Sequence, residues 1–271
     1  MAATNEDIAN SALAKLGAEE ITSLSDTTRR ARLVNRQFVK IRDKLLRSHP
    51  WNFAIKRSFL QAISDSTNAV VAATDIFTSP STLNLETGNL IRFNLTSGGA
   101  LPAPLQENTD YFAIRLTATT FQVATTQANA QSGTQIDITD EPAFTADLFV
   151  GPPFEYSNQF TLPSDYLRAI REEDKSIDWK VEGQRLVANQ ETFNLVYIAR
   201  ITDPTEFDES FDELLATSLA YELAYPLVQS ISLKQQMKDE LDELRRDVRS
   251  FDAQEGQPEE YEANEYLKAR L

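Results

Sequence analysis

The sequence contains no cysteine, and its one histidine is His49. A chain without cysteine forms no disulfide, offers no thiolate to a metal ion and has no cysteine nucleophile. A single histidine also removes most metal sites and acid–base pairs that depend on imidazole. Because His49 precedes Pro50 at the predicted end of a helix, capping or packing is favoured over catalysis at this residue.

Long apolar runs are missing as well. No stretch approaches the roughly 18 apolar residues of a membrane span, and the first residues lack a basic segment followed by an apolar one. The sequence therefore predicts a protein that is neither inserted into a membrane nor secreted.

The usual catalytic signatures are also absent. No serine stands in a nucleophile-elbow sequence, and no glycine-rich phosphate loop follows a predicted strand. Asp178 and Glu182 resemble a glycosidase pair, but with 41 acidic residues such pairs arise by chance and solvated surface is favoured. We expect no catalytic residue, no metal ion, no cofactor and no enzymatic activity.

The net charge of −15 is unevenly spread along the chain. Residues 1–60 carry a net charge of +5, residues 61–150 a net charge of −7, and residues 151–271 a net charge of −13. Three charge zones indicate separate compositional units. The acidic majority argues against wrapping nucleic acid by neutralising its phosphates.

Two amphipathic helices are predicted at the N-terminal end. The first begins at Thr4, with Asp7 three residues on, and ends at Gly17. The second begins near Asp26 and ends before Pro50. Its apolar stripe consists of Ala31, Val34, Phe38, Ile41 and Leu45.

The opposite side of the second helix is basic, with Arg29, Arg32, Arg36 and Lys40 followed by Lys44 and Arg47. Such a row of cations can bind the phosphate groups of nucleic acid. It lacks interleaved aromatic residues, however, and the C-terminal zone of a neighbouring copy is acidic. We therefore favour a contact between subunits, with Arg29, Arg32, Arg36 and Lys40 as the candidates.

The middle of the chain changes to Thr, Ser, Asn and Gly with alternating apolar residues. Residues 90–95, 111–116 and 120–124 are typical of short strands, separated by turn clusters. Further on, residues 179–187 predict a hairpin around Gly183, with residues 195–200 as its partner strand.

The last third is predicted to be helical. Asp203 and Pro204 open a first helix that Pro226 kinks or breaks. Its apolar stripe consists of Phe211, Leu214, Leu215, Leu219 and Leu223. A final helix, ended by residues 256–258, carries Met237, Leu241, Leu244, Val248 and Phe251.

These elements predict an α+β fold. Its helical bundle body is built from N- and C-terminal helices, with a small β-sheet region and an inserted all-β module. The expected parts are the N-terminal helices at 1–60, the β module at 61–152, the small sheet at 153–204, the C-terminal helices at 205–255 and a tail at 256–271. Trp51, Phe53 and Trp179 are expected in the core, although a sugar-stacking surface is the alternative.

Five segments together resemble one family. They are residues 7–17 (DIANSALAKLG), 42–57 (RDKLLRSHPWNFAIKR), 162–168 (LPSDYLR), 179–186 (WKVEGQRL) and 197–204 (YIARITDP). In order and spacing they resemble the head-to-tail adaptor of short-tailed bacteriophages, the tail tubular protein A family. His49, Pro50, Trp51 and Phe53 form the structural motif of the second segment, and the stretch 61–152 departs from the smaller family members.

The resemblance implies a virion protein that is assembled in the host cytoplasm and located in the tail at the portal vertex. Twelve copies would form a ring that docks on the portal protein, extends the DNA channel and carries the tail nozzle, a tail tubular protein B-like partner, and fibres. Viral DNA would pass through without specific binding. The C-terminal tail would reach the portal, with Tyr261, Tyr266, Leu267 and Leu271 as candidate contacts.

Two other functions stay open. In one, the stretch 61–152 recognises a host-surface glycan and the helices only oligomerise, so this stretch alone would bind polysaccharide. In the other, the protein is an enzyme such as a cell-wall hydrolase, and substitution of an Asp or Glu would abolish peptidoglycan release.

Overall fold

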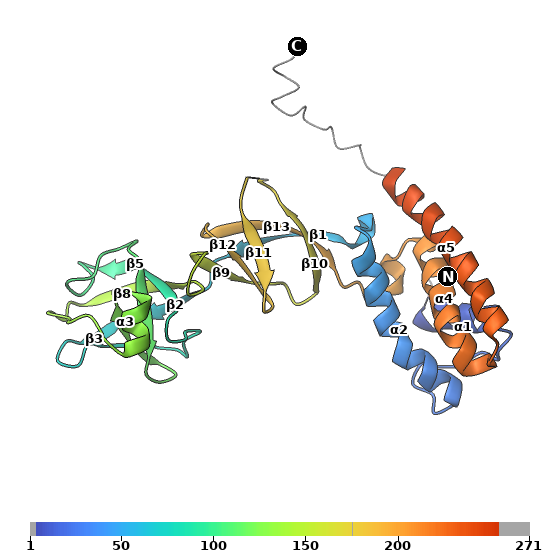
Figure 1. Ribbon diagram of the computed structural model, residues 1–271, viewed down its shortest axis with the longest axis horizontal. Coiled ribbons are helices and arrows are strands. Elements are labelled where there is room, and N and C mark those ends of the chain that lie inside the picture. The colour runs from blue at the N-terminus through green and yellow to red at the C-terminus, as the bar shows by residue number, and fades with distance from the viewer. Residues whose placement is uncertain (1–3, 175, 255–271) are drawn as a thin grey trace, which may run out of the picture. The chain divides into compact units, whose positions relative to one another are not determined.

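The computed structural model describes residues 4–174 and 176–254, and it is a mixed α+β structure (Figure 1). The chain divides into two compact units. The helical unit comprises Met1–Lys56, Asp165–Arg168 and Tyr197–Leu271, and the β unit comprises Arg57–Ser164 and Ala169–Val196.

The first helix, α1 (Asn5–Lys15), begins as predicted at Thr4. The Thr4 hydroxyl accepts a hydrogen bond from the Asp7 backbone N–H (3.1 Å), and the Asp7 carboxylate accepts one from the Thr4 N–H (2.9 Å). This capping box satisfies two backbone donors that have no partner inside the helix. Gly17 follows the helix with a φ of 64°, a conformation that favours glycine.

Helix α2 (Arg29–Ser48) ends as predicted, with His49 in an extended conformation before Pro50. Its five predicted stripe residues are all buried. The predicted start near Asp26 is wrong by about three residues, because Thr28 caps the helix. The Asp26 carboxylate instead accepts hydrogen bonds from the N–H groups of Thr22 and Ser23, which hold the preceding loop.

Helix α4 (Glu209–Leu223) begins five residues after the predicted Pro204. Asp203 caps a separate turn of 3₁₀ helix, η2 (Pro204–Glu206), so the cap of α4 is Asp208, whose carboxylate accepts from the Ser210 N–H at 3.3 Å. At its other end, the predicted break at Pro226 is confirmed. The chain widens into a π-helical turn, η3 (Ala224–Val228), because proline has no N–H to continue the helix.

Helix α4 lies at the centre of the helical unit, in contact with α1, α2 and the last helix, α5 (Ile231–Gln254) (Figure 1). Every residue from 214 to 220 is buried, so the helix is covered on all sides. Two of its buried hydroxyls, those of Thr217 and Ser218, have no hydrogen-bond partner among the described residues. Both side chains are small, so they fit the close packing around this stretch of α4.

The apolar stripe predicted for α5 holds for Met237, Leu241 and Val248, which are buried. It is wrong for Phe251, whose side chain is 60% exposed. The position four residues after Val248 is the one that faces inward, and it is occupied by the buried Asp252. A buried carboxylate at this position needs hydrogen-bond partners.

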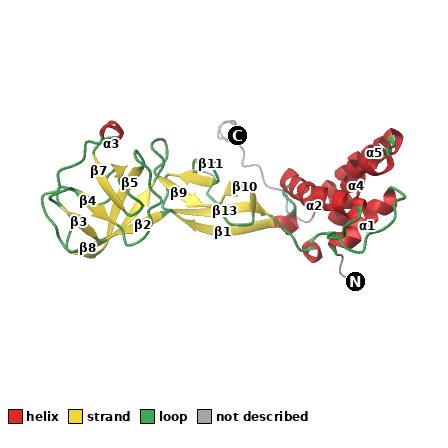
Figure 2. Ribbon diagram, turned by 90° about the horizontal axis from the view of Figure 1, so that it is seen from below, coloured by secondary structure: helices red, strands yellow, loops and turns green. Residues whose placement is uncertain are grey.

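The β unit contains a seven-stranded antiparallel sheet, in the order β2-β8-β5-β6-β7-β4-β3. The strands are β2 (Ser64–Thr67), β3 (Ala69–Val71), β4 (Ile76–Thr78), β5 (Leu90–Gly98), β6 (Tyr111–Arg115), β7 (Thr120–Ala124) and β8 (Phe144–Val150). Strands predicted at 90–95, 111–116 and 120–124 correspond to β5, β6 and β7. A short helix, α3 (Gln127–Ser132), packs beside β6 and β7 (Figure 2) and was not predicted.

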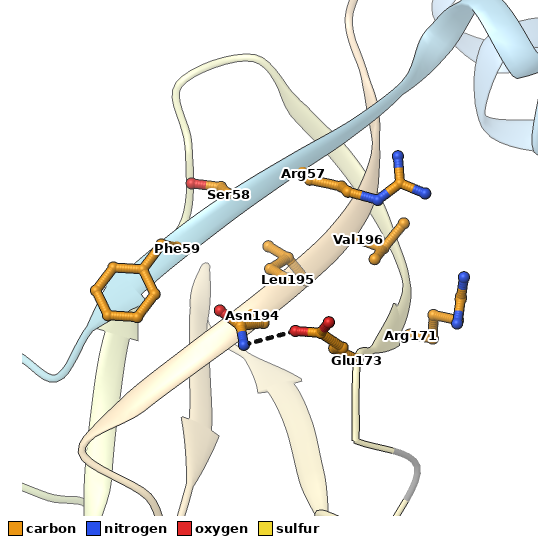
Figure 3. Close-up of a pocket in the computed structure, with 8 residues that line it drawn as sticks. All are labelled: Arg57, Ser58, Phe59, Arg171, Glu173, Asn194, Leu195 and Val196. Carbon is orange, nitrogen blue, oxygen red and sulfur yellow. Dashed lines mark hydrogen bonds between the residues drawn. The ribbon is translucent and has the colours of Figure 1, made fainter.

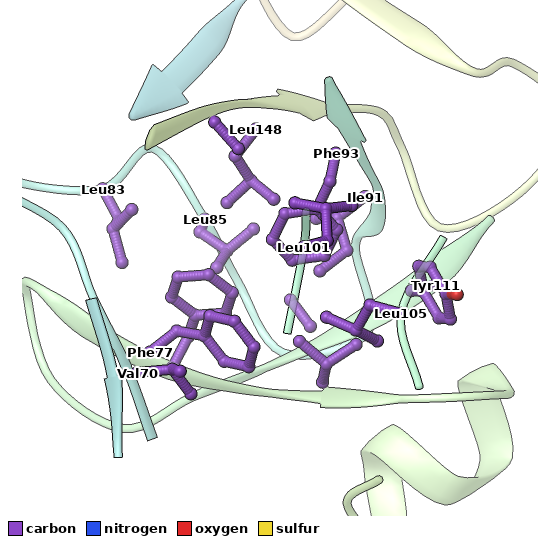
Figure 4. Close-up of a cluster of buried hydrophobic side chains, with 14 of the residues drawn as sticks. Val70, Phe77, Leu83, Leu85, Ile91, Phe93, Leu101, Leu105, Tyr111 and Leu148 are labelled. Carbon is purple, nitrogen blue, oxygen red and sulfur yellow. The ribbon is translucent and has the colours of Figure 1, made fainter. Parts of the chain in front are cut away.

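A cluster of buried aliphatic and aromatic side chains forms the core of this sheet (Figure 4). The ring centroids of Phe77 and Phe121 are 5.3 Å apart, and those of Phe77 and Phe93 are 5.7 Å apart. The alternating apolar residues of these strands therefore point into the core, as their period of two indicates. They are not available for stacking on a ligand.

The remaining strands form two three-stranded sheets. In the first, order β11-β12-β9, the predicted hairpin around Gly183 is confirmed as β11 (Trp179–Glu182) and β12 (Arg185–Ala188). The predicted partner strand at 195–200 is wrong, because β12 pairs with β9 (Asn158–Thr161). That segment belongs to β13 (Thr192–Ala199), the middle strand of a sheet of order β1-β13-β10, with β1 (Ile55–Gln61) and β10 (Tyr166–Glu172). Its continuous apolar run is typical of a central strand.

Candidate functional site: a helix-end clamp and two charged faces

The structural motif predicted after α2 forms a tight turn. Trp51 is buried, and its indole N–H donates to the carbonyl oxygen of Leu45 at 3.0 Å. The indole packs edge-on against the His49 ring, with centroids 4.6 Å apart, and against Phe211 of α4 at 5.3 Å. Phe53, in the following 3₁₀ turn η1 (Asn52–Ala54), is half-buried and packs on the same Phe211 ring at 5.1 Å.

Asp252 of α5 connects to this turn. One carboxylate oxygen of Asp252 lies 2.9 Å from His49 Nε2, and the other accepts from the Asn52 backbone N–H at 2.9 Å. The Asn52 side-chain amide donates in turn to the Asp252 carbonyl oxygen at 2.7 Å. We call His49, Trp51, Asn52 and Asp252 the helix-end clamp. It holds the last described turn of α5 against the end of α2, and it gives His49 a structural partner.

Replacing Asp252 by Ala should lower the free energy of unfolding of the helical unit by about 2 kcal/mol. The Asn52 N–H and the His49 imidazole would then lose their common partner, the buried Asp252 carboxylate. Asp247→Ala is the matched control, because Asp247 is exposed on the same helix, and it should change the stability by less than about 0.5 kcal/mol. Chemical denaturation followed by circular dichroism measures both. Equal stability of the two variants would contradict the role given to the clamp.

The exposed side of α2 carries a continuous row of cations. Arg32, Arg36 and Lys40 recur every fourth residue over about 12 Å, and all three are exposed. None forms an ion pair or a side-chain hydrogen bond within the part of the chain that the structure describes. We call these three residues, together with the exposed Lys44 and Arg47, the basic face.

The other cations of α2 are engaged inside the unit. Arg29, one of the predicted inter-subunit residues, donates to the carbonyl oxygen of Pro226 at 3.0 Å. Arg30 pairs with Glu19 at 2.7 Å, and the buried Arg42 pairs with Asp43 at 2.9 Å. Of the four predicted inter-subunit residues, Arg32, Arg36 and Lys40 therefore lie together without a partner among the described residues. Arg29 differs from them because it is hydrogen-bonded to Pro226.

Acidic side chains gather around the start of α4. No lysine or arginine occurs between Arg200 and Lys234, whereas α5 carries both signs along its length. We define the acidic face as Asp203, Glu206, Asp208, Glu209, Asp212 and Glu213. These six residues belong to the acidic C-terminal zone that was predicted to complement the basic row of a neighbouring copy. Carboxylates at this end are favoured by the helix dipole.

Asp212 carries the strongest perturbation within the acidic face. Burial and the negative charges of Asp208 and Glu209 raise the pKa of Asp212 from 3.8 to about 6. One of its carboxylate oxygens has no hydrogen-bond partner among the described residues. The native state therefore holds the proton of Asp212 more tightly than the unfolded state does, and ionisation near neutral pH costs stability.

Asp212→Asn should therefore raise the melting temperature at pH 7.5, where the native aspartate is ionised, and the gain should disappear at pH 4, below its folded pKa of about 6. Thermal unfolding at the two pH values measures the difference. Glu206→Gln, at an exposed carboxylate, is the control and should have little effect at either pH. The same shift for Asp212→Asn at both pH values would show that its charge is not what matters.

The β unit also has a polar surface. A depression of about 460 Å³ is lined by Leu195, Val196 and their neighbours (Figure 3), and the Asn194 amide donates to Glu173 there at 2.9 Å. Arg57 and Arg171 point to its rim, and Phe59 is 61% exposed at its other end. These groups are spread along an open face, and they do not converge on one point.

The remaining predicted residues are placed as follows. The four candidate portal contacts, Tyr261, Tyr266, Leu267 and Leu271, lie outside the described residues. Trp179 is half-buried with its ring 5.8 Å from that of Phe193. Glu182, which with Asp178 resembles a glycosidase pair in sequence, forms an ion pair with Lys180 at 2.6 Å. Among residues 4–174 and 176–254, no group of three potential metal ligands occurs and no helix is long and apolar enough to cross a membrane.

Comparison with known proteins gives no relative: no protein-family model matches the chain, and no curated protein matches it significantly.

Proposed function

We propose that the protein is a head-to-tail adaptor of a short-tailed bacteriophage, a structural protein of the virion tail without catalytic activity. Copies of the chain form a ring, with twelve as the number implied by the family resemblance. The ring docks on the portal protein, extends the DNA channel and carries the nozzle and fibres. The observation that carries the proposal is that one compact unit bears an unpaired basic face on α2 and an acidic face at the start of α4.

A closed ring requires two different, complementary surfaces on each copy, because each subunit contacts its neighbours head to tail. The basic and acidic faces meet this requirement by charge. Opposite charges also steer two copies into one orientation and penalise like-with-like contacts. A two-fold dimer would bring both faces of each copy into one interface, so the number of copies in the assembly distinguishes it from a ring.

The finer architecture belongs to the same proposal. The helical unit collects segments from both ends of the chain, α1 and α2 from one and α4 and α5 from the other. We assign these helices to the bundle body of the ring wall and residues 61–152 to an inserted β module. The net charge of −15 suits a DNA conduit, since an acidic lumen repels phosphates and lets the duplex slide.

The helix-end clamp has a place in this assembly. It fixes the last described turn of α5, from which the chain continues to the candidate portal contacts near residues 261–271. A segment whose first residue is fixed loses less conformational entropy when it binds than a segment that is free at both ends. The clamp is therefore proposed to position the portal-binding segment.

The test is a charge reversal with rescue. Arg32→Glu, Arg36→Glu and Lys40→Glu together should abolish ring formation with the portal protein of the same genome, because two acidic faces would then meet. Adding Glu206→Lys, Glu209→Lys and Glu213→Lys to the same chain should restore the ring. Mass photometry of the mixture counts the copies.

The control reverses Lys238, Arg246 and Arg249, three exposed cations of α5, and should leave assembly unchanged. A normal ring from the first triple variant would remove the basic face from the interface. A loss in the first variant that the second set of changes does not repair would mean that the two faces do not contact each other.

A further inference from the structure

The β unit contains a cleft of about 570 Å³ that the adaptor proposal does not use. Its lining combines aromatic and planar polar side chains, of which Phe112, Phe154, Arg92, Asp110, Gln127 and Asn189 carry the argument. The volume lies within the range of small-molecule sites in proteins. All lining residues belong to the β unit.

Phe154 is the most exposed aromatic side chain at the cleft. Its exposed fraction is 72%, whereas the nearby Phe112 is half-buried and packs on Ile114, Ala124 and Ala130. An exposed phenyl ring costs free energy in water, and contact with an apolar ligand face recovers it. The ring is therefore a stacking platform without a partner inside the described chain.

The loop that presents Phe154 is held in one conformation. Before it, the Gly151 N–H donates to the Leu90 carbonyl oxygen at 2.8 Å, and after it the Ser157 N–H donates to Asn189 Oδ1 at 3.0 Å. Gly151 passes so close that a Cβ there would lie 2.3 Å from the Ser157 carbonyl oxygen. Between these points the Tyr156 N–H turns back to the Phe154 carbonyl oxygen at 3.0 Å. A platform that is already ordered loses little entropy on binding.

Polar groups around the ring offer donors and acceptors. Arg92 and Asp110 form an ion pair at the cleft that leaves further N–H donors and lone pairs exposed. The Gln127 amide and the Asn189 Nδ2 group make no hydrogen bond with other described residues. Planar amide, carboxylate and guanidinium groups bind paired hydroxyls through two hydrogen bonds at once.

The charge of the cleft discriminates between ligand classes. Its charged residues are Arg92, Asp110 and Glu155, so the lining has a net charge of −1. Phosphate or carboxylate ligands are disfavoured by this charge. A neutral ligand with one apolar face and a rim of hydroxyls fits both the aromatic platform and the amide groups.

We infer that this cleft binds a neutral saccharide, with one sugar ring stacked on Phe154 and its hydroxyls bonded to Arg92, Asp110, Gln127 and Asn189. This activity is independent of ring assembly, since every residue involved lies in the β unit. The cleft lies where β5, β6 and α3 meet the loop at 151–157. Because Phe154 and Asn189 fall outside residues 61–152, it differs from a glycan site formed by that stretch alone.

The experiment uses the intact chain and saturation-transfer NMR with lactose, maltose, cellobiose, chitobiose and methyl α-mannoside, each at about 10 mM because single-site sugar affinities are weak. At least one probe should give saturation transfer, strongest at the ring C–H protons that stack on Phe154. Phe154→Ala should weaken binding of that probe about tenfold or more. Gln127→Ala, as a separate variant, should also weaken binding and should leave the thermal unfolding unchanged.

Phe59→Ala is the matched control, because Phe59 is exposed to a similar degree (61%) and lies in the β unit outside the cleft. It should leave saccharide binding unchanged. No transfer to any probe from the folded protein would overturn the inference, as would a signal that Phe154→Ala does not reduce. Neither outcome bears on ring formation, so the two proposals fail separately.

Discussion

The helical unit depends on the burial of one helix. Helix α4 contacts α1, α2 and α5, and its residues 214–220 have no exposed side. Leu214, Leu215 and Leu219 are each buried, and complete burial of such a side chain is worth about 1.5–3 kcal/mol. Segments from the two ends of the chain are thus joined through a shared core. Without α4 the other three helices would lose the element that all of them contact.

This burial decides which surfaces remain for assembly. Once the apolar stripe of α2 faces α4, the opposite side of α2 lies outward, and Arg32, Arg36 and Lys40 on that side stay unpaired. The start of α4 emerges from the core with its acidic first turn, where the helix dipole favours negative charge. The helix-end clamp completes the unit, because the buried Asp252 accepts hydrogen bonds from the turn after α2. The packing around α4 therefore leaves exposed the two charged faces on which the proposed ring depends.

Local signals predicted local structure well. The capping box at Thr4, the stripe of α2, the break at Pro226 and the hairpin around Gly183 each depend on residues within a few positions of one another. The errors concern competing or distant partners. Asp203 and Asp208 are both suitable caps, and only packing selects Asp208 for α4. The residues of β9 that pair with β12 lie 24–30 positions earlier in the chain, and no local pattern encodes that pairing.

The candidate sites show the same division. The basic row of α2 was visible as a period of four, whereas the internal bond of Arg29 to Pro226 joins residues nearly 200 positions apart. Asp252 was missed because the apolar Phe251 beside it fits the spacing equally well in sequence. Phe154 gives no sequence signal beyond two preceding prolines, since its exposure depends on the two anchors of its loop.

The proposed adaptor function is tested most directly by electron microscopy of the purified protein mixed with the portal protein of its own genome. A ring of twelve copies stacked coaxially on the portal is the expected result. Particles that show the portal alone, with a folded protein that remains unbound, would contradict the adaptor function.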